Sequence, residues 1–441
     1  MADHQFEPET LAIHAGQIPD VATGARALPI YQTTSFVFDS ADHAASLFNL
    51  QTFGNVYSRL SNPTVAALEE RVAALEGGRA ALASASGMAS EAMALMTLLQ
   101  QGDHVVAAGA LYGGSVSMLA VNLKKLGIET TFVDASSIDA FAAAMRPNTR
   151  AVFAESLGNP SLHLLDIAGV AEVAHAHGVP LIVDNTVPSP FLCNPIRFGA
   201  DIVVHSATKY LAGHGTTLGG VMVESGKFPW DNGKFPGMTE PSAGYHGVKF
   251  YETFGDFGFT TRARMETLRV YGAALSPMSA WQILQGVETL HVRMERHCSN
   301  ALAVAEFLRA HPRVSWVNYP GLPDHPQHDL LAKQMRSVNG VPGASGLLAF
   351  GVKPLTAGGK GSAEGGREAG VKFIESAQFM SHLANIGDTR TLIIHPASTT
   401  HRQLDDAQQI AAGVLPDMVR MSVGIEHIDD ILWDIDQALT A

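Results

Sequence analysis

The chain has 441 residues, of which 46% are apolar and only 16% are charged, a composition far from that of disordered proteins. The net charge is −13 and no Lys/Arg cluster is present, which argues against nucleic acid and anionic membrane surfaces as partners. The first six residues lack the basic and apolar regions of a signal peptide, and no apolar run reaches the roughly 20 residues of a membrane span. We therefore expect a cytoplasmic protein. Cys193 and Cys298 form no CxxC pair, so we expect two buried thiols and neither a disulfide nor a thiolate zinc site.

The first half of the chain predicts an α/β domain. Residues 1–64 have mixed polarity and form an N-terminal arm, and apolar residues at helical spacing then predict a helix over 65–78 that stops at two glycines. Short apolar strands alternate with helical stretches as far as about residue 225. The strands are expected at 104–109, 150–156, 179–186 and 200–206, and the helices at 90–102 and 166–178. Because these strands are apolar throughout, they indicate a mostly parallel, doubly wound sheet covered by helices, in a large domain over 65–275.

The second half predicts a smaller α+β domain over 276–441. Residues 226–260 are rich in glycine, proline and aromatic residues and lack periodicity, which is typical of a long functional or intersubunit loop. Helices are expected over 262–312, with a break at Ser276-Pro277. The remaining elements are strands at 314–319 and 346–352, a flexible glycine-rich surface loop at 355–370 and a terminal amphipathic helix.

The motif SATKYLAGHG places Lys209 directly after a predicted strand. Ligands bind at the carboxyl ends of strands in open α/β sheets, and a partly desolvated lysine there is suited to attack an aldehyde. Ser206 and Thr208 flank the lysine with hydroxyl groups that could hold a phosphate. A lone lysine at a strand end is nevertheless more often an ordinary polar turn residue.

Three further motifs precede Lys209 in a fixed order. Ser86, Gly87 and Met88 begin an alanine-rich helix whose free N–H groups could bind phosphate. Tyr112 could stack on an aromatic ring, and Asp184 could pair with a protonated pyridine nitrogen. Each alone is better explained as a helix cap, a strand-end aromatic or a turn aspartate. Their combination with Lys209 favours the functional interpretation.

The order and spacing of these motifs resemble the Cys/Met-metabolism family of fold-type I pyridoxal-phosphate enzymes over nearly the whole chain. The resemblance implies that Lys209 binds pyridoxal 5′-phosphate covalently and transfers substrate protons. It also implies that Asp184 pairs with the ring nitrogen and that Tyr112 stacks on the ring and assists proton transfer. The other implied cofactor-binding residues are Ser86, Gly87, Met88, Ser206 and Thr208 around the phosphate and Asn159 at the phenolic oxygen.

The resemblance extends to the arm and to the substrate. The motif YSRLSNPT matches the family's arm that crosses into a neighbouring subunit, so Tyr57 and Arg59 would complete the partner's phosphate site. This implies a homo-oligomer, at least a dimer and usually a tetramer. Arg420 matches the arginine that binds the substrate carboxylate, and Asn385 and Arg402 are further candidates for substrate binding.

Features outside these motifs indicate the sulfhydrylase branch of the family. They are the chain length, the insertion at 226–260 and the run at 385–404. The implied reaction is a γ-replacement that converts O-acetyl-L-homoserine and sulfide, or methanethiol, to homocysteine, or methionine, and acetate. It implies roles in methionine biosynthesis and transsulfuration. The acyl group of the substrate, the working nucleophile and the choice between dimer and tetramer stay open.

Several alternatives compete with this interpretation. A methionine γ-lyase or a cystathionine γ-synthase-like enzyme would use the same cofactor motifs. A nucleotide-binding oxidoreductase is disfavoured because no GxGxxG follows the first strand, and a catalytically inactive scaffold is disfavoured because Lys209, Asp184, Tyr112 and Arg420 are all present. His395 and His401 lie six residues apart with no third ligand nearby, so we expect no metal.

Overall fold

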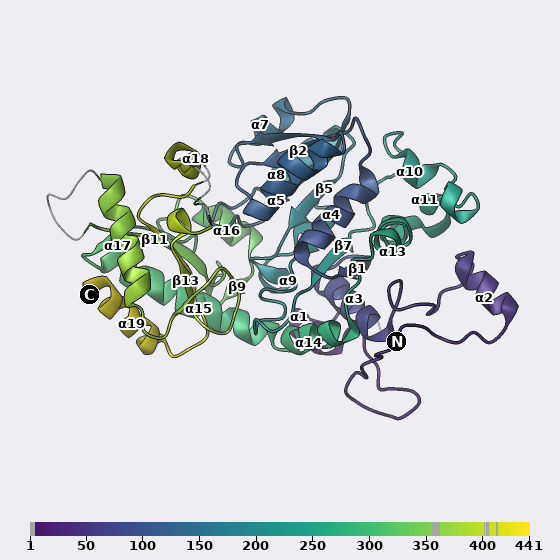
Figure 1. The fold of residues 1–441 in the computed structure, drawn as a ribbon, viewed down its shortest axis with the longest axis horizontal. Helices are drawn as coiled ribbons and strands as arrows, with labels where there is room; N and C mark the ends of the chain where they lie inside the picture. The colour runs from purple at the N-terminus through teal and green to yellow at the C-terminus, as the bar shows by residue number, and fades with distance from the viewer. Residues whose placement is uncertain (1–4, 355–361, 401, 403–404, 412) are drawn as a thin grey trace.

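The chain folds around two large β-sheets (Figure 1). The computed structural model describes residues 5–354, 362–400, 402, 405–411 and 413–441. The first sheet has seven strands in the order β1-β7-β6-β5-β4-β2-β3. Their bounds are Ala80–Ser84 (β1), His104–Ala108 (β2), Glu129–Val133 (β3), Thr149–Glu155 (β4), Leu181–Asp184 (β5), Ile202–His205 (β6) and Gly220–Glu224 (β7). Only β7 runs antiparallel to its neighbours in this sheet, so the predicted mostly parallel sheet is confirmed.

The helices that pack on this sheet begin and end where local sequence signals place them. Helix α3 (Pro63–Glu76) starts with the Asn62 side chain accepting a hydrogen bond from the Thr64 N–H, and it ends at Gly77, whose φ of 70° suits glycine. Helices α4 (Gly87–Leu98) and α8 (Ile167–Ala176) also pack against the sheet. All residues of β2 and β6 are buried, which explains why these strands read as unbroken apolar runs.

The second sheet has five strands in the order β12-β13-β14-β11-β8. Their bounds are Val314–Asn318 (β8), Leu347–Val352 (β11), Ser381–His382 (β12), Leu392–Ile394 (β13) and Met418–Ser422 (β14). Helices α15 (Leu290–Ala310) and α17 (Ser362–Ser376) pack against this sheet, and α19 (Ile428–Thr440) packs against both helices. Helix α14 (Pro277–Glu288) precedes α15 after the predicted break. Strands β8 and β11 and the amphipathic helix α19 confirm the smaller α+β unit.

Two predicted loops contain regular structure. Residues 226–260 form short helices, α10 (Pro236–Thr239), α11 (Phe250–Phe254) and the start of α12 (Gly258–Arg262), in place of a long loop. The rings of Trp230 and Phe259 stack with centroids 5.3 Å apart, so the aromatic residues build a local core that helical periodicity does not reveal. The glycine-rich stretch 355–370 was expected to be a loop, but α17 begins at Ser362, and residues 355–361 lie outside the described part of the chain.

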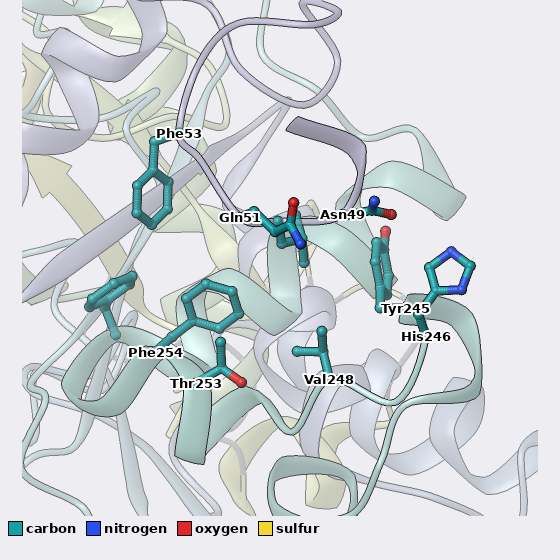
Figure 2. A pocket seen from close by; sticks show the side chains of 10 residues that line it. Asn49, Gln51, Phe53, Tyr245, His246, Val248, Thr253 and Phe254 are labelled. Atoms are coloured by element: carbon teal, nitrogen blue, oxygen red, sulfur yellow. The ribbon is translucent and has the colours of Figure 1, made fainter. Parts of the chain in front are cut away.

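The N-terminal arm is the least buried part of the molecule. Helix α1 (Pro8–His14) packs against α3 and α14, whereas α2 (Ala41–Phe48) projects away from the body at the right of Figure 1. Apolar side chains of the arm are exposed, with Val37 at 96% and Phe53 at 79% of their maximum. Figure 2 shows Phe53 of the arm close to Phe254 of α11, with ring centroids 6.4 Å apart, and both side chains line a hollow of about 790 Å³.

The structure bears on the predictions about the two cysteines and about membrane-spanning helices. Cys193 and Cys298 are buried free thiols, as predicted. Within the part of the chain that the structure describes, no helix combines the length and apolarity needed to cross a bilayer.

Candidate active site

A cavity of about 250 Å³ lies at the carboxyl ends of the parallel strands, where residues following β1, β2, β4, β5 and β6 meet residues of the second sheet. The structure therefore brings together motifs that are far apart in the sequence. The predicted site residues that line the cavity are Ser86, Gly87, Met88, Tyr112, Asn159, Asp184, Ser206, Thr208, Lys209, Asn385 and Arg420.

One end of the cavity is formed by the start of α4 and the turn after β6. The Ser86 hydroxyl accepts a hydrogen bond from the Ala89 N–H at 3.2 Å, which leaves the N–H groups of Gly87 and Met88 at the open helix end. A Cβ atom on Gly87 would lie 2.6 Å from the Cβ of Ser206, so glycine is required for this close approach. Free N–H groups beside hydroxyl groups form a cradle that fits a phosphate.

Lys209 lies in the turn after β6, and its Nζ donates a hydrogen bond to the Asn385 Oδ1 at 2.5 Å. Burial, followed by the nearby positive charge of Arg420, lowers the pKa of Lys209 to about 8. A much larger fraction of this amine is therefore neutral near pH 7 than for an exposed lysine. The neutral form is the nucleophile that an aldehyde requires.

Arg420 lies on β14 and faces Lys209 from the second sheet. Its Nη1 donates to the Asn159 Oδ1 at 3.1 Å and its Nη2 donates to the Asn385 carbonyl at 3.0 Å. Burial lowers its pKa to about 10, so the guanidinium still carries its charge at neutral pH. Among the described residues, its buried Nε has no hydrogen-bond partner and no carboxylate pairs with Arg420. Such a guanidinium is suited to bind the carboxylate of a small substrate.

Asp184 ends β5 beside a second carboxylate. The register pairs Asp184 with Glu155, the last residue of β4. The Asp184 Oδ1 accepts a hydrogen bond from the Thr186 N–H at 2.8 Å, and burial raises the Asp184 pKa. A carboxylate at this position could hold the proton of a ring nitrogen.

Sequence reasoning missed two acidic residues of the cavity, Glu91 and Glu155. Glu155 accepts hydrogen bonds from the N–H groups of Tyr112 and Asn159 and thereby anchors two predicted site residues. Its place at the end of the strand next to Asp184 was a usable signal. Glu91 follows Gly87 by one turn of α4, so the two share a helix face.

Three predicted residues lie outside the cavity. Tyr57 and Arg59 lie on the arm, where the guanidinium carbon of Arg59 is 5.4 Å from the centroid of the Tyr57 ring. Arg402 is exposed, although Thr400 from the same segment lines the cavity. His395 uses its ring nitrogens in contacts with the Ser398 Oγ and the Pro416 carbonyl, and His401 lies outside the described residues.

The cavity contains the groups that pyridoxal phosphate requires. Lys209 offers an amine of lowered pKa to the aldehyde, Asp184 offers a buried carboxyl to the ring nitrogen, and the start of α4 offers a cradle to the phosphate. The side of Tyr112 that lines the cavity could cover the ring. These residues match the aldehyde, the ring nitrogen and the phosphate of the cofactor.

Comparison with known proteins supports this fit. A family model described as "Cys/Met metabolism PLP-dependent enzyme" matches residues 9–440. An O-acetyl-L-homoserine sulfhydrylase of Leptospira meyeri is 53% identical over 98% of this chain and 97% of its own length. A homocysteine synthase of Schizosaccharomyces pombe is 49% identical over 98% of this chain and 97% of its own length.

A solved structure shows the same fold with the cofactor attached. It is the structure of a Campylobacter jejuni protein provisionally described as an O-acetylhomoserine (thiol)-lyase, and it contains a pyridoxyl-lysine phosphate. The TM-score is 0.92 and the identity 39%, covering 99% of this chain and all of the other. With a family model spanning nearly every residue, the chain belongs to the Cys/Met-metabolism family of pyridoxal-phosphate-dependent enzymes.

Proposed function

We propose that the enzyme is an O-acetyl-L-homoserine sulfhydrylase that exchanges the γ-acetoxy group of its substrate for sulfide or methanethiol. The Cγ–O bond breaks, acetate leaves with its electron pair, and a Cγ–S bond forms, so the products are homocysteine or methionine and acetate. The observation that carries this proposal is the position of Lys209 beside the buried Arg420, with Asn385 accepting a hydrogen bond from each of them. The names of full-length relatives support the choice of substrate.

The side chains of the cavity have distinct roles in such a reaction. When bound, pyridoxal phosphate supplies an electron-accepting ring that stabilises negative charge on substrate carbons. The lowered pKa of Lys209 makes its neutral amine available to take the proton from Cα and to return protons later. Arg420 holds the substrate carboxylate, and Asn385 and Asn159 fix the orientation of its guanidinium. Asp184 keeps the proton on the ring nitrogen.

The arm supports a proposal about assembly. Its apolar side chains, including Val21, Val37 and Phe53, are exposed in the single chain. We propose that residues 17–61 pack against a second copy, with Tyr57 and Arg59 completing the partner's phosphate site. The proposed assembly is a tetramer built from such dimers, working in the cytoplasm.

A product assay tests the proposed reaction. Purified holoenzyme is mixed with O-acetyl-L-homoserine with and without sulfide, and homocysteine, acetate and 2-oxobutanoate are quantified. We expect homocysteine to form only with sulfide and in equal amount to acetate. Formation of 2-oxobutanoate and ammonia without sulfide would identify a lyase instead. O-Succinyl-L-homoserine in the same assay tests the choice of acyl group.

The lowered pKa of Lys209 predicts how cofactor attachment depends on pH. The rate at which apoprotein attaches pyridoxal phosphate should rise with pH and level off above about 8, because only the neutral amine attacks the aldehyde. In Arg420→Gln the midpoint should rise, since the positive charge that contributes to the lowered pKa is gone. Stopped-flow absorbance of the apoproteins measures both midpoints. A midpoint near that of free lysine in the unmodified protein would contradict the burial argument.

Arg420 should determine affinity for the substrate carboxylate. In Arg420→Ala we expect kcat/KM for O-acetyl-L-homoserine to fall by about 10²- to 10³-fold, mainly through KM, because a buried charge-assisted pair is lost. Arg420→Lys keeps the charge but not the fork of donors, so its loss should be smaller. Arg309→Ala, which removes an exposed arginine paired with Asp324, is the matched control. Equal KM values in Arg420→Ala and the unmodified enzyme would refute the assignment.

A further inference from the structure

Three carboxyl groups converge on the cofactor end of the cavity. Glu91 on α4, Glu155 at the end of β4 and Asp184 at the end of β5 all line it. Burial is the main cause that raises the pKa of each, and mutual repulsion adds to it for Glu91 and Glu155. Ionising three neighbouring carboxyl groups in one buried site is costly, which favours a proton held by one of them.

The hydrogen-bond donors around the three carboxyl groups indicate which of them holds the proton. Glu155 accepts one main-chain N–H on each oxygen, from Tyr112 on Oε1 and from Asn159 on Oε2. Asp184 accepts the Thr186 N–H. Glu91 is 3% exposed, and its buried Oε2 has no hydrogen-bond partner among the described residues. The nearby Ser115 hydroxyl favours the ionised form of Glu91, but burial and the charge of Asp184 outweigh it and raise the Glu91 pKa. A carboxylic acid at this place needs only an acceptor.

Asp184 is that acceptor. The Glu91 carboxyl lies within hydrogen-bonding reach of Asp184 and faces the Ser115 hydroxyl on α5 (Gly113–Ser117). We propose that Glu91 is a protonated positioning residue that donates a hydrogen bond to Asp184 and holds that carboxylate, ionised and oriented, toward the pyridine nitrogen of the cofactor. This inference rests on the assignment of Asp184 to the ring nitrogen and does not depend on which γ-substituent is exchanged.

The other charged groups around the pair are consistent with one shared proton. His205 on β6 lies close enough to favour the ionised form of Asp184, and Glu155 on β4 disfavours ionisation of Glu91. The cations of the cavity, Lys209 and Arg420, pair with Asn385 and Asn159. Neither cation pairs with Glu91, which therefore depends on its proton for neutrality.

A neutral donor beside Asp184 has a definite effect on the cofactor. The donated hydrogen bond lowers the basicity of Asp184, so the proton of the ion pair stays on the ring nitrogen. Removing the donor makes Asp184 a stronger base and draws that proton away from the ring. The ring then carries less positive charge, and its visible absorbance should titrate at higher pH.

Two variants at position 91 test this in holoenzyme without substrate. Glu91→Gln keeps a neutral donor of the same shape, and Glu91→Leu removes the donor at similar volume. The pH titration of the cofactor's visible absorbance should be unchanged in Glu91→Gln and displaced upward by roughly one pH unit in Glu91→Leu. Infrared spectra of the unmodified holoenzyme should contain a protonated-carboxyl C=O band that Glu91→Gln lacks.

Each outcome decides the matter. If Glu91 is ionised, Glu91→Gln removes a negative charge, so its titration moves downward and no carboxyl band is lost. A displaced titration in Glu91→Gln or an unchanged one in Glu91→Leu overturns the proposal. Should Glu91→Leu fail to fold, the infrared band of the unmodified enzyme and its loss in Glu91→Gln decide alone. A lyase result in the product assay would leave these spectra unaffected, so the two proposals fail separately.

Discussion

Lys209→Ala is expected to abolish multiple turnover, with a loss of about 10⁴-fold or more, because one amine serves both as the attachment point and as the proton carrier. Among the described residues that line the cavity, the other basic side chain is Arg420, which stays charged at neutral pH and donates hydrogen bonds to Asn159 and Asn385, so it cannot replace the amine. Homocysteine formation by the purified variant measures the effect.

A second measurement separates loss of chemistry from loss of folding. Borohydride reduction of the unmodified holoenzyme followed by peptide mass spectrometry should place the cofactor on the peptide containing Lys209, and the variant should carry no such label. Lys249→Ala, which removes a surface lysine paired with Glu252, should keep both label and activity. Sustained turnover by Lys209→Ala, or a label on another lysine, would overturn the assigned role.

Asp184→Ala is expected to reduce kcat by roughly 10²- to 10³-fold, which corresponds to about 2.7–4.1 kcal/mol of activation free energy and is of the size expected for breaking a buried ion pair. Without this carboxylate the ring nitrogen loses its proton, and the ring accepts electrons less well. Steady-state kinetics at saturating cofactor measure the loss.

The control for Asp184→Ala is Asp201, a buried aspartate directly before β6 that lies outside the cavity. Asp201 pairs with His175 at 2.8 Å, and Asp201→Ala should lower thermal stability while leaving the cofactor's visible spectrum unchanged. Asp184→Ala should instead change that spectrum in the absence of substrate. Near-normal kcat with an unaltered spectrum would contradict the ring-nitrogen pairing.

Much of the fold could be predicted because its signals are local. Unbroken apolar runs identified β2, β4, β5 and β6, and paired glycines marked the end of α3 at Gly77. The segment around Trp230 could not be predicted in this way, since its order comes from ring packing against Phe259 and not from a repeating pattern. The start of α17 was not predicted because its first turns are rich in glycine, which is typical of loops. The helix forms there because it packs against β11 and α19.

Site residues could be predicted from the sequence where they end or directly follow a strand, because the carboxyl ends of the parallel strands meet at the cavity. Lys209 and Asp184 follow from that rule, and Glu155 would have followed from it as well. Arg420 could be assigned only through the family resemblance, because its partner Asn159 lies 261 positions away in the sequence. Glu91 was missed because an acidic residue inside a helix looks like surface until the packing of α4 is known.

The cavity takes residues from both sheets, and this couples cofactor supply to the lifetime of the folded chain. Pyridoxal phosphate can meet Ser86, Lys209 and Arg420 together only after both halves of the chain have folded and docked. Binding therefore selects the native state and stabilises it by mass action, by about 2.7 kcal/mol when free cofactor is at 100 times its dissociation constant. Chains made under vitamin shortage should unfold and be degraded sooner, so that enzyme abundance follows the availability of the cofactor.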